Sequence, residues 1–123
     1  MTFNINWDKN GVYLKFRGVV NAQDLIDANN YVISNKSFDQ INYQIFDFLD
    51  IDEFDISDND INILGMMDKS QSEFKSEMKV AMVTKDNEVI NILREYNIHL
   101  EDSSWITDIF TDIDSARNWA KKK

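Results

Sequence analysis

The chain opens with two short runs in which apolar and polar residues alternate. Residues 3–7 and 12–17 both have this period of two, which is typical of half-buried β-strands. Asn10-Gly11 stands just before the second run, and this dipeptide favours the tight turn of a β-hairpin. The first 17 residues therefore predict an antiparallel hairpin.

From Asn21 the apolar residues recur every three or four positions, as on one side of a helix. Asn21 itself is a good N-cap residue. Further helices are predicted to begin near Ser57, Asp86 and Asp112, each a residue type that caps helix N-termini.

Three apolar runs between these helices predict strands, at residues 43–49, 79–84 and 105–110. The resulting order, ββαβαβαβα, contains three strand-helix-strand crossovers, which require parallel strands. We expect an α/β fold with a five-stranded, mostly parallel mixed sheet, an N-terminal antiparallel hairpin and four helices. Residues 1–123 are expected to form one domain.

The second helix is the least regular of the four. Its apolar positions are spaced to extend the helical pattern from Ile61 as far as Phe74 and Met78. Gly65 and the polar residues 70–72 interrupt this pattern, so we expect a weak or broken middle. A stretch at residues 50–60 is expected to be an acidic loop leading into this helix.

Composition excludes several kinds of chemistry. The chain has 22 acidic and 13 basic residues, a formal net charge of −9, so nucleic acid is not an expected partner and membrane association is at most peripheral. One histidine and no cysteine leave no disulfide, thiol nucleophile or multi-histidine metal site.

No secretory signal or spanning apolar run is present, so we expect a cytoplasmic protein.

Seven carboxylates fall between Asp47 and Asp60 with no basic residue among them. A cation-dependent enzyme is one hypothesis for such a stretch, but the calcium-loop pattern fails because Ile63 and Lys69 stand where glycine and glutamate are required. A solvated loop before a helix is the favoured interpretation. Asp47 lies between two phenylalanines. A partly buried carboxylate is one interpretation, and a side chain at the end of a strand that reaches solvent is the favoured one.

No motif for catalysis or cofactor binding emerges. There is no glycine-rich phosphate loop, and the lone His99 has no sequence relation to a serine nucleophile. We therefore predict no enzyme activity, no catalytic residues, no metal and no cofactor.

Aromatic and methionine residues near the second helix are candidates for an apolar ligand site or a protein interface. The candidates are Phe48, Phe54, Met66, Met67 and Phe74.

Several segments together resemble one bacterial family, the SpoIIAA-like (STAS/SEC14-type) single-domain proteins. The resemblance spans nearly the whole chain and rests on the order and spacing of residues 16–20, 22–25, 45–47, 80–84 and 109–112, with Ala116 and Trp119 in the last helix. It implies a βα superhelix with strands in sequential order and the first strand antiparallel at an edge. Crossovers that advance in one direction place their helices on one face, so the other face needs a cover.

The resemblance also suggests two activities, because relatives include anti-sigma-factor antagonists and lipid carriers. Ser57 stands roughly where the antagonists carry a phosphorylated serine, and the second helix is a candidate lid over a lipid. We predict a non-enzymatic binding module, with a homodimer expected, that takes an apolar small molecule or lipid, or a protein partner, near the second helix. A phosphoregulated switch at Ser57 with a regulatory protein is the alternative.

Overall fold

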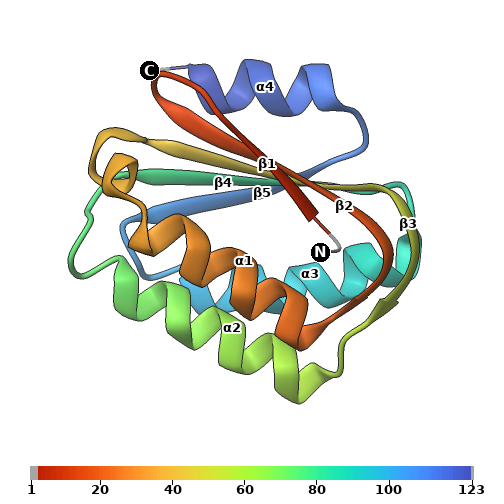
Figure 1. Cartoon of the computed structure of the whole chain (residues 1–123). Coiled ribbons are helices and arrows are strands. Elements are labelled where there is room, and N and C mark those ends of the chain that lie inside the picture. The colour runs from red at the N-terminus through yellow and green to blue at the C-terminus, as the bar shows by residue number, and fades with distance from the viewer. Residues whose placement is uncertain (1–2, 123) are drawn as a thin grey trace.

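The five strands form a single mixed sheet in the order β1-β2-β3-β4-β5, as the computed structural model of residues 3–122 shows (Figure 1). The strands are β1 (Phe3–Trp7), β2 (Gly11–Asn21), β3 (Tyr43–Asp55), β4 (Met78–Val83) and β5 (Trp105–Phe110). β1 is antiparallel to β2, and all other neighbours are parallel. The predicted hairpin, crossovers and sequential strand order are confirmed.

Four α-helices and one short 3-10 helix connect and follow the strands. The helices are α1 (Ala22–Ser34), α2 (Asp58–Gln71), α3 (Asn87–Leu100) and α4 (Ile113–Lys121), with the 3-10 turn η1 at Lys36–Gln40. The predicted capping residues Asn21, Ser57, Asp86 and Asp112 are confirmed, because each side chain accepts a hydrogen bond from a backbone N–H of the first helical turn.

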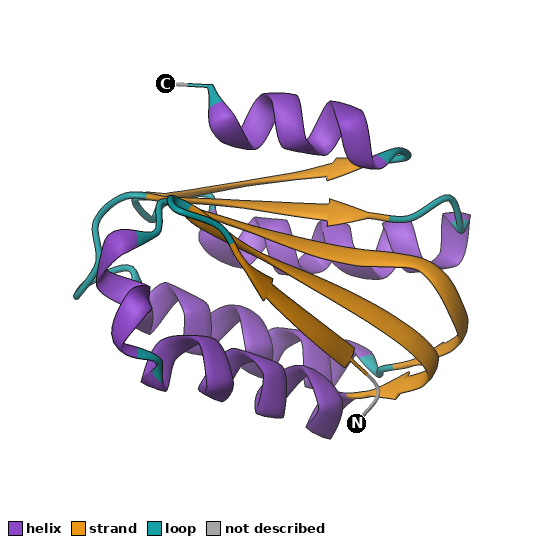
Figure 2. Ribbon diagram, turned by 45° about the horizontal axis from the view of Figure 1, so that its top comes forward, coloured by secondary structure: helices purple, strands orange, loops and turns teal. Residues whose placement is uncertain are grey.

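The helices are divided unequally between the two faces of the sheet. The three crossover helices α1, α2 and α3 lie together on one face, whereas α4 lies on the other (Figure 2). The expectation that the crossover helices share one face is therefore confirmed, and α4 is the cover expected on the other face. The handedness rule constrains only a helix that connects two parallel strands. Within residues 3–122, α4 does not connect two strands, and it covers the second face.

Two cores result from this arrangement. The larger one fills the space between the sheet and α1–α3 and contains Phe16, Phe48 and Leu93. The smaller one lies under α4, where Ala116 and Ala120 pack against side chains from β3 and β4. Small alanines on the inner side of α4 allow this helix to approach the sheet closely.

β3 is longer than predicted. It extends through Asp55, so residues 50–55 of the expected acidic loop are strand. Here β3 pairs only with β2, up to Asn21↔Asp55, because the pairing with β4 ends at Asp47↔Val83. Residues 17–21 and 50–55 thus form a two-stranded arm beyond the main sheet, and Gly18, with φ +70, lies at a register shift where the arm begins.

α2 is shorter and more regular than predicted. It ends at Gln71, so Phe74 lies in the following turn and Met78 begins β4. The expected break in the middle is wrong, because the helix is continuous through Gly65. This glycine is a contact point with α3: a Cβ atom there would lie 2.7 Å from Cβ of His99. The polar residues 70–72 mark the end of the helix instead.

Candidate functional site

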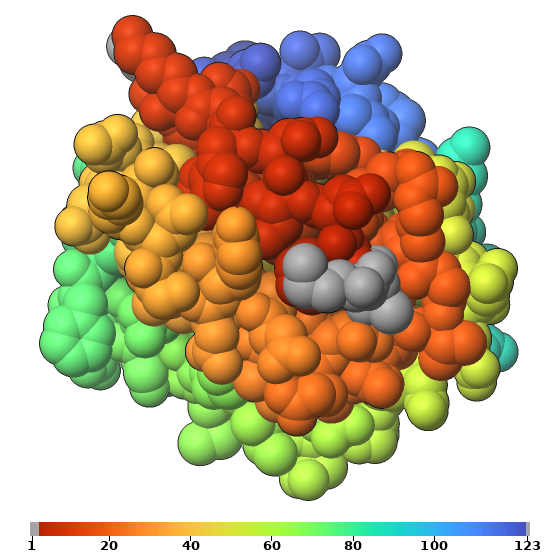
Figure 3. Space-filling view, in the orientation of Figure 1, coloured from red at the N-terminus to blue at the C-terminus, as the bar shows by residue number. Residues whose placement is uncertain are grey.

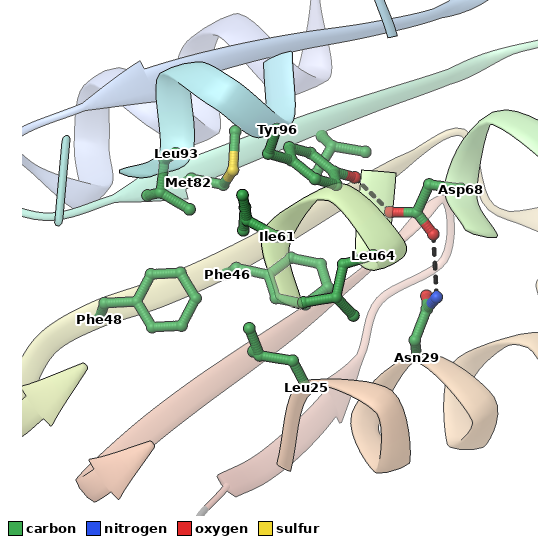
Figure 4. A pocket seen from close by; sticks show the side chains of 11 residues that line it. Leu25, Asn29, Phe46, Phe48, Ile61, Leu64, Asp68, Met82, Leu93 and Tyr96 are labelled. Carbon is green, nitrogen blue, oxygen red and sulfur yellow. Dashed lines mark hydrogen bonds between the residues drawn. The ribbon is translucent and has the colours of Figure 1, made fainter. Parts of the chain in front are cut away.

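A small apolar cavity lies between the sheet and the three helices α1, α2 and α3 (Figure 4). The space that water-sized spheres can occupy is about 40 Å³, which corresponds to about three water molecules. Every crossover helix and two central strands contribute to its wall, which includes Leu25, Phe46, Phe48, Leu64, Met82 and Leu93. The cavity therefore belongs to the larger core.

One end of this cavity is polar and is built from one residue of each helix. The Asp68 carboxylate of α2 accepts a hydrogen bond of 2.9 Å from the side-chain amide of Asn29 on α1 and another from the hydroxyl of Tyr96 on α3 (Figure 4). All three side chains are buried, with Asp68 only 8% exposed. We call these three residues the Asp68 triad.

Burial dominates the electrostatics of the triad. It raises the pKa of Asp68 from 3.8 to about 6, although the hydrogen bonds from Tyr96 and Asn29 act in the opposite direction by stabilising the carboxylate. Burial, together with the Asp68 charge, raises the pKa of Tyr96 well above its usual value. The ion pairs of residues 3–122 do not include Asp68, so its buried charge has no cationic neighbour in this part of the chain.

A second buried carboxylate, Asp47, lies on the α4 face of the sheet and is compensated. It is 1% exposed, so the favoured interpretation, a side chain that reaches solvent, is wrong and the alternative, burial, holds. Its carboxylate accepts hydrogen bonds from the hydroxyl of Tyr13 and, at 3.2 Å, from Nζ of Lys15, which also pairs with Asp50 at 2.7 Å. Burial, and then the bond to Asp47, raises the pKa of Tyr13 to about 12. This cluster ties β2 to β3.

A solvent-open groove of about 860 Å³ lies where the parallel strands begin, beside the end of α4. Lys79 donates from Nζ to the backbone carbonyls of Trp119 and Lys122, at 2.9 and 2.7 Å, and Lys121 approaches Asp8 at 3.9 Å. These lysines are used to fasten the C-terminal end of α4 to the sheet.

The five predicted ligand or interface residues do not converge on one site. Phe48 is buried in the cavity wall, and Phe54 and Met67 are half-buried outside it. Met66 and Phe74 point away from the core, with 61% and 85% of their surface exposed. In Figure 3, α1 and the first hairpin cover the front of the molecule and α2, in yellow-green, forms its lower rim.

Ser57 is exposed at the start of α2 and forms a reciprocal capping box. Its hydroxyl accepts from the backbone N–H of Asp60 at 3.1 Å, and the Asp60 carboxylate accepts from the backbone N–H of Ser57 at 3.2 Å. This geometry explains why the helix starts at this residue.

The carboxylates between residues 47 and 60 do not come together in one group. Within residues 3–122 there is no group of three or more acidic, histidine or cysteine side chains that could hold a metal ion. The carboxylates are instead spread along the two-stranded arm and the first turn of α2. His99 contacts Asn62 at 2.7 Å across the α2–α3 interface. Over the same described range, every helix is too short or too polar to cross a bilayer.

The Asp68 triad was missed at the sequence level, although the helical pattern contains a sign of it. Asp68 follows Leu64 by four positions, so it falls on the same inward side of α2. Asn29 has the same relation to Leu25, and Tyr96 follows Leu93 by three. A polar residue in a core position of three successive helices is the pattern that indicates such a cluster.

A sequential mixed sheet with one antiparallel edge and three crossover helices on one face defines a SpoIIAA-like α/β fold. Solved structures bear this out. The chain superimposes on the unphosphorylated anti-sigma factor antagonist SpoIIAA with a TM-score of 0.63 at 8% identity, covering 98% of this chain and 99% of that one. A DUF3478 protein from Shewanella loihica with a SpoIIAA-like fold gives a TM-score of 0.56 at 16% identity, covering 96% and 91%. No family model and no curated protein matches the chain.

Proposed function

We propose that the chain is a non-enzymatic binding module that engages a protein partner through the outer side of α2 and the turn that follows this helix. The observation that carries this proposal is the exposure of Ile63, Met66 and Phe74, three of the seven large apolar side chains exposed within residues 3–122. Ile63 and Met66 are three positions apart and so lie on the same side of the helix. We call these three residues the α2 surface.

Charge next to the α2 surface suggests the chemistry of the partner. Asp52, Glu53, Asp55 and Asp58 are exposed at the end of the arm and the start of α2, and no ion pair of the described residues includes them. A matching surface would carry an apolar patch flanked by lysines and arginines, because complementary charge speeds encounter and selects partners. The solved structure of SpoIIAA, an anti-sigma factor antagonist, is a precedent for a regulatory protein partner on this fold.

Site-specific photocrosslinking tests the proposal. A photoreactive amino acid replaces Met66 in one tagged variant and Ile106 in the matched control, since Ile106 is similarly exposed, at 56%, but lies on β5. We expect a discrete adduct from position 66 in the native cells, reduced by high salt, and none from position 106. Equal adducts from both positions, or none from position 66, would contradict the proposal.

The mass of the adduct distinguishes the occupants of the α2 surface. An adduct whose mass is that of the tagged variant plus a second copy of this 14.5 kDa chain, with peptides from this chain alone, would make a second copy the occupant, as the expected homodimer requires, and would overturn the proposal of a different protein. An adduct of any other mass, identified by sequencing its peptides, would support it.

The exposed hydroxyl of Ser57 favours a second, regulatory function, and we propose that its phosphorylation strengthens partner binding, because the added negative charge attracts the lysines and arginines of the partner. A phosphate would replace the hydroxyl in the capping box with Asp60 and would add charge beside Asp55 and Asp58. Mass spectrometry of protein from native cells tests for the phosphate. The crosslinking yield from position 66 should rise in Ser57→Asp and remain normal in Ser57→Ala; a fall in Ser57→Asp would contradict this proposal.

A lipid is the less favoured occupant. The cavity of about 40 Å³ is well below the roughly 300 to 1,000 Å³ of pockets that enclose larger ligands. Lipid carriage would therefore require α2 to move away from the sheet. A lipid retained in the native mass spectrum of the purified protein would indicate that this movement occurs.

A further inference from the structure

We propose that the cavity next to Asp68 binds a small primary amine in its ammonium form, with the charge paired to the Asp68 carboxylate and the apolar part among the side chains of α1–α3. This inference goes beyond the proposed protein partner, because the cavity and the α2 surface lie on opposite sides of α2. Amine binding in the cavity and protein binding at the α2 surface are therefore tested separately, and the failure of one does not imply the failure of the other.

The missing countercharge is the first argument. Aspartate is rarely this deeply buried unless a cation pairs with it. Asp47, the other deeply buried carboxylate described here, has such a partner in Lys15 at 3.2 Å. Asp68 is held only by the neutral groups of Asn29 and Tyr96. A ligand ammonium would place next to Asp68 the positive charge that Lys15 places next to Asp47.

The geometry of the triad leaves room for this partner. A carboxylate has about four acceptor positions on its two oxygens. One oxygen of Asp68 accepts from Asn29 and the other from Tyr96, so about two positions remain. Asp68 also lines the cavity, which means that an ammonium group placed there would lie next to the carboxylate and its tail would face Leu64, Met82 and Leu93.

A purely structural role for the triad does not require the charge. An amide at position 68 would accept from Tyr96 through its oxygen and, once the Asn29 amide has turned over so that its oxygen faces position 68, would donate to Asn29 through its nitrogen; it would join the three helices as well as the carboxylate does. The carboxylate adds a desolvation cost with no structural contact that an amide lacks. A cationic ligand explains its presence.

The volume of the cavity limits the size of the ligand. About three water-sized spheres fit in 40 Å³, which corresponds to roughly three or four non-hydrogen atoms. Ethylamine and n-propylamine have this size. With so few atoms, the tightest Kd to be expected is on the order of tens of micromolar.

Methyl NMR with n-propylamine at near-neutral pH tests the proposal, with 1-propanol and propionate as the uncharged and anionic probes of similar shape. We expect saturable shifts at the methyl groups of Leu64 and Met82, and none at the outer Ile106. Propanol should bind at least tenfold more weakly, and propionate should produce no saturable shift.

Two variants make the test specific for the charge. Asp68→Asn should weaken propylamine binding at least tenfold, whereas Asp52→Asn, which removes an exposed carboxylate outside the cavity, should bind as the wild type does. Three results would each overturn the proposal: no saturable shift up to about 50 mM amine, far above the expected Kd; equal binding of amine and propanol; or unchanged binding in a folded Asp68→Asn protein. Met66→Asp should leave propylamine binding unchanged.

Discussion

Replacing Asp68 by asparagine should stabilise the protein at neutral pH and remove part of its pH dependence. The substitution keeps the shape of the side chain and its links to Asn29 and Tyr96, and it removes only the ionisable group. Burial raises the pKa of the folded carboxyl to about 6, above its ordinary 3.8. The folded state therefore binds this proton more tightly than the unfolded state does, and the associated stability is present below pH 3.8 and lost as the pH rises through about 6.

The magnitude follows from the gap between the two values. At roughly 1.36 kcal/mol per pKa unit, the gap between 3.8 and about 6 corresponds to about 3 kcal/mol. The free energy of unfolding of Asp68→Asn minus that of the wild type should thus increase by about 3 kcal/mol between pH 3.5 and pH 7.5. The other carboxylates contribute to both proteins, so their effects cancel in this difference.

Urea unfolding followed by tryptophan fluorescence measures this difference, since Trp105 is buried in the folded state. Protein concentrations should be low, because the pH range crosses the sequence pI of about 4.4 and a protein with little net charge tends to precipitate. Asp52→Asn serves as a control for removing an exposed aspartate. A difference between Asp68→Asn and wild type that stays constant across this pH range would refute the reasoning, as would an Asp68→Asn protein that is less stable than wild type at pH 7.5.

Three further substitutions test the packing and the ends of α2 by urea unfolding. Gly65→Ala should destabilise the protein by about 1–3 kcal/mol because the new Cβ would lie 2.7 Å from Cβ of His99. This cost should exceed the gain from the higher helix propensity of alanine. An increase in stability would mean that α3 moves aside freely. Ser57→Ala should cost about 1 kcal/mol through loss of the cap on Asp60, and no loss would show that the capping box contributes little. Phe74→Asp should change stability by less than about 0.5 kcal/mol because Phe74 is 85% exposed, so a large loss would contradict this placement.

The order of elements was predictable because local chemistry sets it. The alternation at residues 3–7 and 12–17 and the Asn10-Gly11 turn are sufficient for the hairpin, and capping residues such as Ser57 and Asp112 fixed the helix starts. These features depend on neighbours along the chain.

The features that could not be predicted depend on contacts between distant segments. The strand at residues 50–55 is acidic, and it forms because β2 offers a paired edge as far as Asn21. Nothing near Gly65 in the sequence shows that His99 packs against it. The same holds for the position of α4, which depends on the free face of the sheet.

The candidate site was only partly predictable for a related reason. Apolar candidates were chosen by residue type, and type does not distinguish Phe48 in the cavity wall from Phe74 in solvent. Residue type alone would place Asp68 at the surface, because aspartate is rarely buried. Its spacing from Leu64 was the better guide, since helical geometry decides which side a residue faces.

α2 is unusual because both of its sides depart from the normal amphipathic pattern. A surface helix normally buries apolar residues and exposes charged ones, yet α2 buries the carboxylate of Asp68 and exposes Met66 two positions earlier. Each departure is unfavourable: one desolvates a charge and the other leaves apolar surface in water. Proteins retain such local conflicts mainly where function requires them. The two departures on one helix therefore favour α2 over α1, α3 and α4 as the functional element of this fold.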